Sequence, residues 1–182
     1  MFILSTFQGF ERAYPLIVLF GLLMVFFITH NKDYLMLFFA LEIISVMNLF
    51  LKNVIFKKIM GSQEYLILGK GTRPKGAQSC GEFINIDERE SSSYGMPSGH
   101  SNFSAFFAVV MIIMILNDKK SKNIRIFKIG IVLIISGIIL FSRINLGGHT
   151  YQQVIMGGLI GSIFGYIYIS NIQRIKTLIH VR

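Results

Sequence analysis

Tryptophan is absent from this chain of 182 residues, cysteine occurs once, at Cys80, and proline occurs three times. A single cysteine excludes a disulfide bond within the chain and says nothing about the redox compartment. Acidic residues are also scarce, with nine Asp and Glu against 18 Lys and Arg. Because these carboxylates form no paired cluster suited to magnesium, we expect neither a metal nor a cofactor.

The basic excess gives a formal charge of +9, a sign that nucleic-acid-binding proteins share. The basic residues are spread over the flanks of apolar segments, however, and no module of interleaved aromatic and basic residues is visible. We therefore assign the charge to the edges of a membrane and predict no nucleic-acid partner.

Apolar residues dominate the chain, which is 53% hydrophobic. This is far more than a soluble domain of this size carries. Five runs are long enough, or nearly so, to cross about 30 Å of hydrocarbon at about 1.5 Å per helical residue. They cover residues 14–29, 34–56, 97–116, 124–141 and 150–170. The sequence predicts an all-α, polytopic membrane helical bundle that forms one domain over residues 1–182.

Two segments outside these spans differ from them in composition. Residues 1–10 are apolar but contain no basic residue, which argues against a cleaved signal peptide. A short interfacial helix and an unstructured end fit this segment about equally well. Residues 57–96 are rich in glycine and serine, so we expect turns there, forming a cap over the membrane surface.

Five spans determine which connections share a side of the membrane. The cap and the loop 142–149 fall on one side, and the turn 30–33, the loop 117–123 and the tail after Asn171 fall on the other. Lysines and arginines flank the short loop and occupy the tail, which is typical of the cytoplasmic side. The cap side is therefore expected to be non-cytoplasmic: the endoplasmic reticulum lumen in a eukaryote, the periplasm or exterior in a bacterium.

Two short motifs lie at the edges of apolar spans on the cap side. The first is Pro97-Ser98-Gly99-His100. Pro97 suits the first turn of a helix, and Ser98 offers a hydroxyl beside backbone N–H groups that bind anions. Gly99 lets a ligand approach the backbone without meeting a Cβ. By itself the motif fits an ordinary turn into a helix equally well.

The second motif favours a functional site over an ordinary turn. Arg143 ends the fourth span and His149 begins the fifth, with Gly147-Gly148 allowing a tight reversal between them. Charged residues at this depth are rare unless they are paired or functional. A third basic element, Arg73-Pro74 in the cap, offers a guanidinium fork that matches phosphate oxygens, although a basic turn alone is more often a solvated loop.

Together these motifs resemble the signature of the type 2 phosphatidic acid phosphatases: a lysine with Arg-Pro, then Pro-Ser-Gly-His, then Ser-Arg and five residues to a histidine. The second and third parts match letter for letter, and the 41 residues between His100 and Ser142 suit the family's spacing. The resemblance covers about residues 52–165.

The first part of the signature departs from the family, because the position seven before Arg-Pro is Leu66. The candidate lysines are Lys52, Lys57, Lys58 and Lys70. We favour Lys52, which falls near the Ser45 and Asn48 stripe of the second span. Residues 52–55 also resemble the dolichyl-diphosphate phosphatase branch. Glu42 is placed on the same side, as a structural counter-charge or as a hydrogen-bonding group inside the bundle.

Gln153 is a second departure, since the family commonly has aspartate four residues after the last histidine. A glutamine carbonyl can orient the ring of His149 but stabilises its positive charge only in part. Alternatively, Thr150 and Gln153 form a capping box at the start of the fifth span. The dolichyl-diphosphate phosphatase branch also has glutamine here, so we do not interpret it as evidence that the enzyme is inactive.

The resemblance implies the roles of the site residues. His149 is the nucleophile, giving a phosphohistidine, and His100 is the general acid and base. The phosphoryl group is held by Lys52, Arg73, Ser98, Gly99 and Arg143, supported by Gln153, Pro74 and Pro97. The expected partners are the bilayer and a lipid phosphate, preferably a polyprenyl diphosphate such as dolichyl diphosphate. Phosphatidic acid, transfer to an alcohol, and a catalytically silent anion-binding scaffold are the alternatives.

Glycines at 157, 161 and 165 form a small-residue ridge on the fifth span, which permits close helix contact. Packing against the fourth span is the expected use, with dimerisation as the alternative. His30 and His180 fall on the side opposite the motifs and are expected to have no role.

Overall fold

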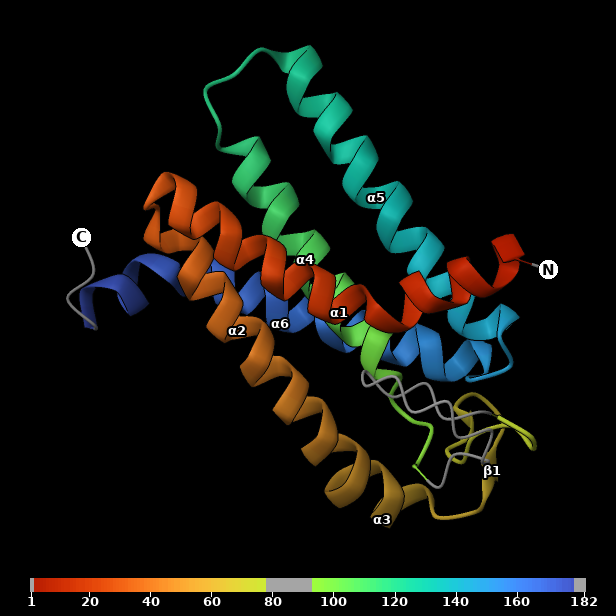
Figure 1. Ribbon diagram of the computed structural model, residues 1–182. Helices are drawn as coiled ribbons and strands as arrows, with labels where there is room; N and C mark the ends of the chain where they lie inside the picture. The colour runs from red at the N-terminus through yellow and green to blue at the C-terminus, as the bar shows by residue number, and fades with distance from the viewer. Residues whose placement is uncertain (1, 78–92, 179–182) are drawn as a thin grey trace.

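The computed structural model describes residues 2–77 and 93–178. Cys80 and His180 lie outside the described residues. In chain order the elements are α1 (Phe2–Thr29), α2 (Lys32–Phe50), the π-helical turn η1 (Leu51–Phe56), α3 (Lys57–Met60), β1 (Glu64–Tyr65), β2 (Gly69–Lys70), α4 (Gly99–Leu116), α5 (Lys122–Asn145) and α6 (Tyr151–Leu178) (Figure 1).

Within residues 2–77 and 93–178, five helical stretches are long and apolar enough to cross a membrane, as the sequence predicts. The second of them runs without a break through α2, η1 and α3. In the described part of the chain, the strands are the two-residue antiparallel pair β1 and β2, which lies in the cap. The prediction of an all-helical membrane bundle is therefore confirmed.

Three helices are longer than their apolar spans. α1 begins at Phe2, so residues 2–10 are neither a separate interfacial helix nor an irregular end. Glu and Arg are good helix formers, so Glu11-Arg12 ends the apolar run without ending the helix. Likewise α5 continues through Arg143 to Asn145, and the tail after Asn171 is the end of α6. Hydropathy located the membrane segments but not the ends of the helices.

The glycine ridge of α6 packs against α4, not against α5 as predicted. A Cβ at Gly157 or Gly161 would overlap the backbone oxygens of Ser98 and Asn102, and one at Gly165 would lie 2.9 Å from the Phe106 oxygen. The ridge brings the two backbones so close that Ser98 N–H donates to the Gln153 carbonyl at 3.0 Å. This close contact joins two of the predicted motifs.

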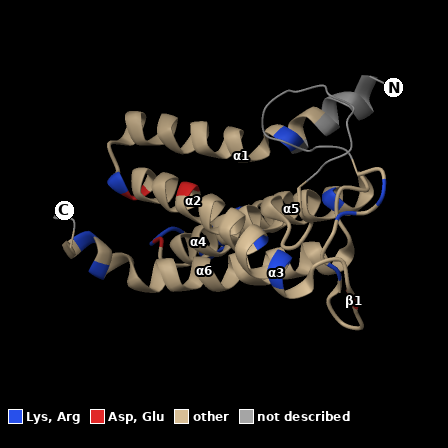
Figure 2. Ribbon diagram, turned by 90° about the horizontal axis from the view of Figure 1, so that it is seen from below, with Lys and Arg blue, Asp and Glu red and all other residues tan. Residues whose placement is uncertain are grey.

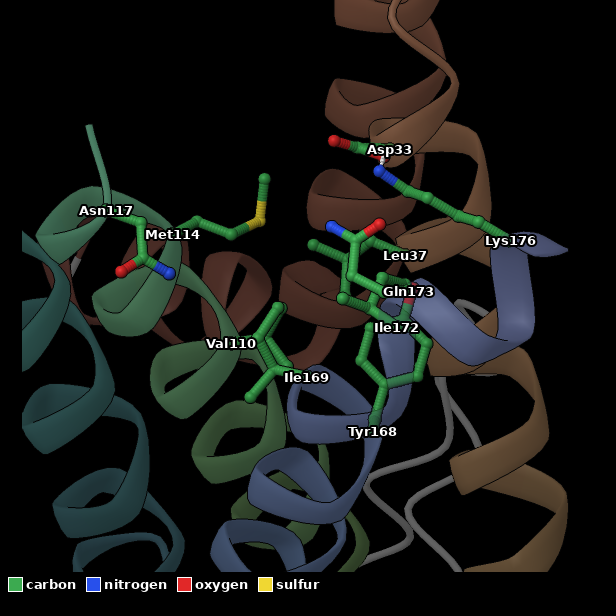
Figure 3. Close-up of a pocket in the computed structure, with 10 residues that line it drawn as sticks. All are labelled: Asp33, Leu37, Val110, Met114, Asn117, Tyr168, Ile169, Ile172, Gln173 and Lys176. Carbon is green, nitrogen blue, oxygen red and sulfur yellow. Dashed lines mark ion pairs between the residues drawn. The ribbon is translucent and has the colours of Figure 1, made fainter. Parts of the chain in front are cut away.

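The opposite end of the bundle gathers the three segments that the topology predicts there. Asp33 at the start of α2 pairs with Lys176 near the end of α6, and Asn117 follows α4. These residues line a cavity of about 240 Å³ together with Tyr168, far along α6 from the motifs (Figure 3). Lysines and arginines lie at this end and around the cap (Figure 2). The cavity is thus separate from the motif end.

Glu42 does not have the predicted internal role, because its side chain is exposed on α2. The buried stripe of this helix contains Leu41, Ile44 and Asn48. Glu42 precedes Asn48 by six residues, which places it about 120° away around a helix of 3.6 residues per turn. The helical-wheel argument placed Lys52 well but grouped Glu42 with it incorrectly.

Candidate active site

Three distant segments meet at Gln153 in the first turns of α6. The side chain is completely buried, and its Nε2 donates to the carbonyls of Lys70 at 2.9 Å and Thr72 at 2.7 Å. Its Oε1 lies 3.0 Å from Nδ1 of His149. With the backbone bond from Ser98, one residue connects the cap, the Pro-Ser-Gly-His motif and the last histidine.

This arrangement determines which ring nitrogen of His149 carries the proton. The two carbonyls accept hydrogen bonds only, so the amide must direct its NH₂ toward them and its oxygen toward His149. An amide oxygen also only accepts, and Nδ1 must therefore be the protonated nitrogen. The lone pair of the neutral ring is left on Nε2, which is free of Gln153.

The capping box and the His149 contact exist together. Thr150 is the residue before α6, and its N–H donates to Gln153 Oε1 at 3.3 Å, while Gln153 N–H donates to Thr150 Oγ1 at 3.3 Å. A carbonyl oxygen has two lone pairs and accepts from both the ring and the backbone. The two interpretations of Gln153 were posed as alternatives, and the structure has both.

His149 itself is buried, with 4% of its surface exposed. Burial lowers the pKa of His149, and the positive charges of Arg73, Lys52 and Arg143 lower it further, against a smaller opposing effect of the Gln153 hydrogen bond. The ring is therefore neutral over the physiological range. A neutral imidazole with a free Nε2 is the form that can attack an electrophile.

Two arginines come to this site from different elements. Arg73 in the cap donates from Nε to Ser93 Oγ at 3.0 Å and from Nη1 to the Gly148 carbonyl at 3.3 Å. Arg143, 1% exposed, lies in the last turn of α5 and donates from Nε to Ser142 Oγ at 3.3 Å. Ser93 carried no signal in the sequence, because one serine beside a glycine-rich turn is unremarkable.

Of the four lysines considered for the first motif, Lys52 alone is buried, with 6% exposed. It lies on the π-helical turn η1, a local irregularity that is frequent at functional sites. Lys57 and Lys58 are exposed, and Lys70 forms an exposed ion pair with Glu64 at 3.4 Å. Lys52 is the lysine whose charge reaches His149.

His100 lies in the first turn of α4, within reach of the charges of Arg143, Arg73 and Lys52. Both histidines therefore face the same three cations. The Nε2 atom of His100 is 3.5 Å from the backbone oxygen of Arg12 in α1. A contribution of α1 to this region could not be predicted, because Arg12 belongs to no motif.

Ser98 and Pro97 differ in detail from the prediction. α4 begins at Gly99 with Ser98 as its N-cap, so Pro97 precedes the helix and does not occupy its first turn. The N–H of Ser98 is occupied by the Gln153 carbonyl, and its hydroxyl accepts from Ser101 Oγ at 2.9 Å. The N–H groups of Gly99 and His100 have no partner within the helix by geometry and can bind an anion.

Gly99 packs closely against α2 as well as leaving the backbone accessible. A Cβ there would lie 3.1 Å from Nδ2 of Asn48, one turn before Lys52 on the same helix. The buried Asn48 accepts at Oδ1 from Nδ2 of Asn102 at 3.0 Å. This amide pair joins α2 to α4 beside the site.

A second set of contacts joins the two ends of the cap to each other. The Gly71 carbonyl accepts from the N–H groups of Gly95 and Met96, both at 3.0 Å, and Tyr94 Oη donates to the Gly61 carbonyl at 2.9 Å. A Cβ at Gly71 would overlap Tyr94, so glycine is needed there. Pro74 continues this segment into a turn closed by Ala77 N–H.

In the described ranges, no three His, Cys, Asp or Glu side chains gather in a way that suits a metal ion. The polar groups of the site are instead cations, hydroxyls and two imidazoles. Such a set can hold a tetrahedral anion between positive charges, with one neutral histidine beside it.

The sequence profile of the PAP2 superfamily matches residues 14–176 of this chain. Dolichyldiphosphatase 1 of Dictyostelium discoideum is 36% identical over 91 residues, 48% of this chain and 40% of that protein. Dolichyldiphosphatase of Saccharomyces cerevisiae is 28% identical over 178 residues, 96% of this chain and 66% of that protein. Dolichyldiphosphatase 1 of Homo sapiens is 30% identical over 95 residues, 47% of this chain and 40% of that protein.

The chain therefore spans less than two thirds of the length of these relatives. No solved structure gives a significant match.

Proposed function

Because this chain belongs to the PAP2 superfamily, we propose that it is a membrane lipid phosphatase that works through a phosphohistidine. The preferred substrate in this proposal is a polyprenyl diphosphate such as dolichyl diphosphate. The names of the similar proteins support that choice, and so does the resemblance of residues 52–55 and of Gln153 to that branch.

In the first step, Nε2 of His149 attacks the terminal phosphorus in line with the departing oxygen. The N–P bond forms as the P–O bond breaks, and His100, protonated in the substrate complex, gives its proton to the leaving polyprenyl phosphate and becomes neutral. The Nδ1 proton stays on the ring and donates a hydrogen bond to Gln153 Oε1, which partly offsets the new positive charge. Splitting the displacement in this way replaces one difficult step by two easier ones.

In the second step, His100 takes a proton from a water molecule, which attacks the phosphorus of the phosphohistidine. The N–P bond breaks, inorganic phosphate leaves, and both histidines return to their starting forms. Acid–base assistance of this kind contributes about 10²- to 10⁴-fold.

Lys52, Arg73 and Arg143 are proposed to hold the three equatorial oxygens of the phosphoryl group. Charge spreads over these oxygens during transfer, so fixed cations in a water-poor site stabilise the transition state more than the ground state. The Gly99 and His100 N–H groups at the start of α4 add hydrogen bonds from the opposite side. No step of this mechanism requires a metal ion.

The single observation that carries the proposal is the state of His149. It is a buried, neutral imidazole whose Nδ1 is hydrogen-bonded to Gln153, beside three cations from three different elements. Cations beside a histidine oppose its protonation, so these surroundings keep the ring in the neutral, nucleophilic form. An incoming phosphate neutralises these cations.

We also propose that this end of the bundle faces away from the cytosol. The opposite end carries the short loop with Lys119, Lys120 and Lys122, and basic residues in short loops are retained on the cytoplasmic side.

The test is phosphate release by the purified protein in detergent with a chelator present. Dolichyl diphosphate, phosphatidic acid and a soluble sugar phosphate are compared as substrates. We expect release from the diphosphate, and loss of at least about 10²-fold in His149→Ala and His100→Ala. Phosphate binding without turnover of any substrate would support the silent scaffold, and chelator-sensitive turnover would refute the metal-free mechanism.

A further inference from the structure

Gln153 receives its orientation from the cap and not from His149. Its NH₂ group donates to two carbonyls, those of Lys70 and Thr72, which flank Gly71. The opposite orientation would place Oε1 against both carbonyls and forfeit two buried hydrogen bonds. Each such bond is worth about tenfold in an equilibrium, so the docked cap favours the observed orientation by about 10²-fold.

His149 follows this orientation. With Oε1 toward the ring, the proton resides on Nδ1 and the lone pair on Nε2. If the cap residues were withdrawn, only the 3.3 Å hydrogen bond from the Thr150 N–H would still favour this orientation of Oε1, and the amide could turn and present its NH₂ to the ring. Nδ1 would then accept, Nε2 would carry the proton, and the nitrogen that must attack phosphorus would have no lone pair to offer.

We propose that docking of the cap loop, residues 69–74, sets the tautomer of His149 through Gln153. The docked cap thereby keeps a lone pair on Nε2, the nitrogen that attacks phosphorus. The inference rests on the proposed phosphatase function for its catalytic meaning. Arg73 belongs to the same loop and is bonded to the Gly148 carbonyl beside His149. One docking event therefore delivers a phosphate-binding cation and activates the nucleophile at once.

This role explains why the residue at 153 is glutamine. A carboxylate accepts hydrogen bonds from the ring but cannot donate to the two carbonyls, and an aspartate is also shorter by one methylene group. Only a side chain with an acceptor and two donors can connect the ring to this cap. Gln153 is thus a positioning residue with two partners, rather than a weakened substitute for aspartate.

The packing around the amide leaves little freedom while the cap is docked. A Cβ on Gly95 would lie 2.6 Å from both the oxygen and the nitrogen of the Gln153 amide. Gly95 and Met96 also donate their N–H groups to the Gly71 carbonyl, in the middle of the cap loop. These two amide protons therefore report on docking without any need for turnover.

The decisive variant is Gln153→Glu, which keeps the acceptor for His149 and removes both donors to the cap. Its matched control is Gln173→Glu, with the same charge change at an exposed residue of α6 far from the cap loop. Two measurements are made on each protein in detergent: hydrogen exchange of the Gly95 and Met96 amides, and KM and kcat with dolichyl diphosphate. In Gln153→Glu we expect at least about tenfold faster exchange and a rise of about tenfold or more in KM, and in Gln173→Glu neither.

Gly95→Ala tests the same link from the other side and guards against misfolding of the first variant. The added methyl group displaces the amide while Gln153 itself is retained. We expect ¹⁵N spectra of the His149 ring to show the Nδ1–H tautomer in the wild type and a mixture in Gly95→Ala.

Unchanged amide exchange in Gln153→Glu, or a single unaltered tautomer in Gly95→Ala, would overturn the inference. A fall in kcat of Gln153→Glu with exchange and KM unchanged would also overturn it, because Gln153 would then act on His149 alone. Exchange and tautomer are read without substrate, so an inactive wild type would refute the proposed function and leave this link open to the same measurements.

Discussion

Nδ1 of His149 and Oε1 of Gln153 lie 3.0 Å apart, one helical turn from each other at the start of α6. The contact leaves Nε2 of a buried, neutral ring unengaged by Gln153, beside Lys52, Arg73 and Arg143. The reactivity proposed for this protein depends on that pairing, whereas the pH dependence of its stability depends on the burial of the ring beside the three cations.

The stability of the folded protein is expected to fall as the pH drops below the usual pKa of histidine. Burial and neighbouring cations lower the pKa of His149 in the folded state, whereas the unfolded chain takes up a proton near its ordinary pKa of about 6.5. Below that pH the unfolded state binds more protons, so the free energy of unfolding decreases. The thermal midpoint of the wild type should drop more steeply than that of His149→Gln between about pH 7.5 and 5.5. Parallel curves would contradict the buried neutral ring.

Replacement of Lys52 by methionine is expected to weaken substrate binding. Methionine fills a similar volume but removes the charge that Lys52 contributes beside His149. Loss of one charge-assisted hydrogen bond costs about 1.5–3 kcal/mol, so KM should rise about 10- to 100-fold. Lys58→Met is the control, because Lys58 is exposed at the end of the same helical stretch. An equal effect in both variants would remove Lys52 from the first motif.

Alanine at Gly161 is expected to destabilise the bundle, whereas alanine at Gly158 is not. A Cβ at Gly161 would overlap the Asn102 backbone, while one at Gly158 would lie 3.6 Å from a Leu140 methyl group. Overpacking a rigid backbone contact costs about 1–3 kcal/mol, which lowers the thermal midpoint by several degrees. Thermal unfolding in detergent measures both variants, and equal midpoints would show that α6 does not pack against α4 through this ridge.

The amide pair between α2 and α4 is expected to show coupling in a double-mutant cycle. Asn48→Leu leaves Asn102 Nδ2 without its acceptor, and Asn102→Leu leaves Asn48 Oδ1 without its donor. Each buried, unsatisfied group costs about 1–3 kcal/mol, while removal of both partners avoids part of that cost. Unfolding free energies of the two single variants and the double variant give the coupling. Additive losses would mean that the pair does not interact.

Much of this arrangement could be predicted from the sequence. Hydropathy located the five membrane segments and the sides of their connections, because an apolar run of about 20 residues has few alternatives to a spanning helix. The order of the spans placed both histidine motifs and the cap on one side, and the family resemblance then implied that Arg143, His149 and the cap would meet. Helical geometry favoured Lys52 over Lys57 and Lys58, the resemblance of residues 52–55 to the dolichyl-diphosphate phosphatase branch supported the choice, and Lys52 is the buried one.

What the sequence could not supply is the set of contacts between helices. The glycine ridge predicts that another helix packs closely against the fifth span. It does not show which helix this is, since small residues permit contact with any neighbour. Nothing in the sequence shows that α6 approaches the Pro-Ser-Gly-His motif and that the Gln153 carbonyl accepts from the Ser98 N–H. The two carbonyls that orient Gln153 belong to the backbone. Every residue has a backbone carbonyl, so residue types do not show which of them accept from Gln153.

The central claim is that His149 carries the phosphoryl group between the two steps. Brief reaction of the purified protein with dolichyl diphosphate labelled on its terminal phosphate, followed by alkaline quenching and peptide mapping, tests it directly. We expect an acid-labile label on the peptide that contains His149, stronger in His100→Ala than in the wild type because the water step is slowed, and absent from His149→Ala. Label on another residue, or phosphate release by His149→Ala at the wild-type rate, would contradict the account.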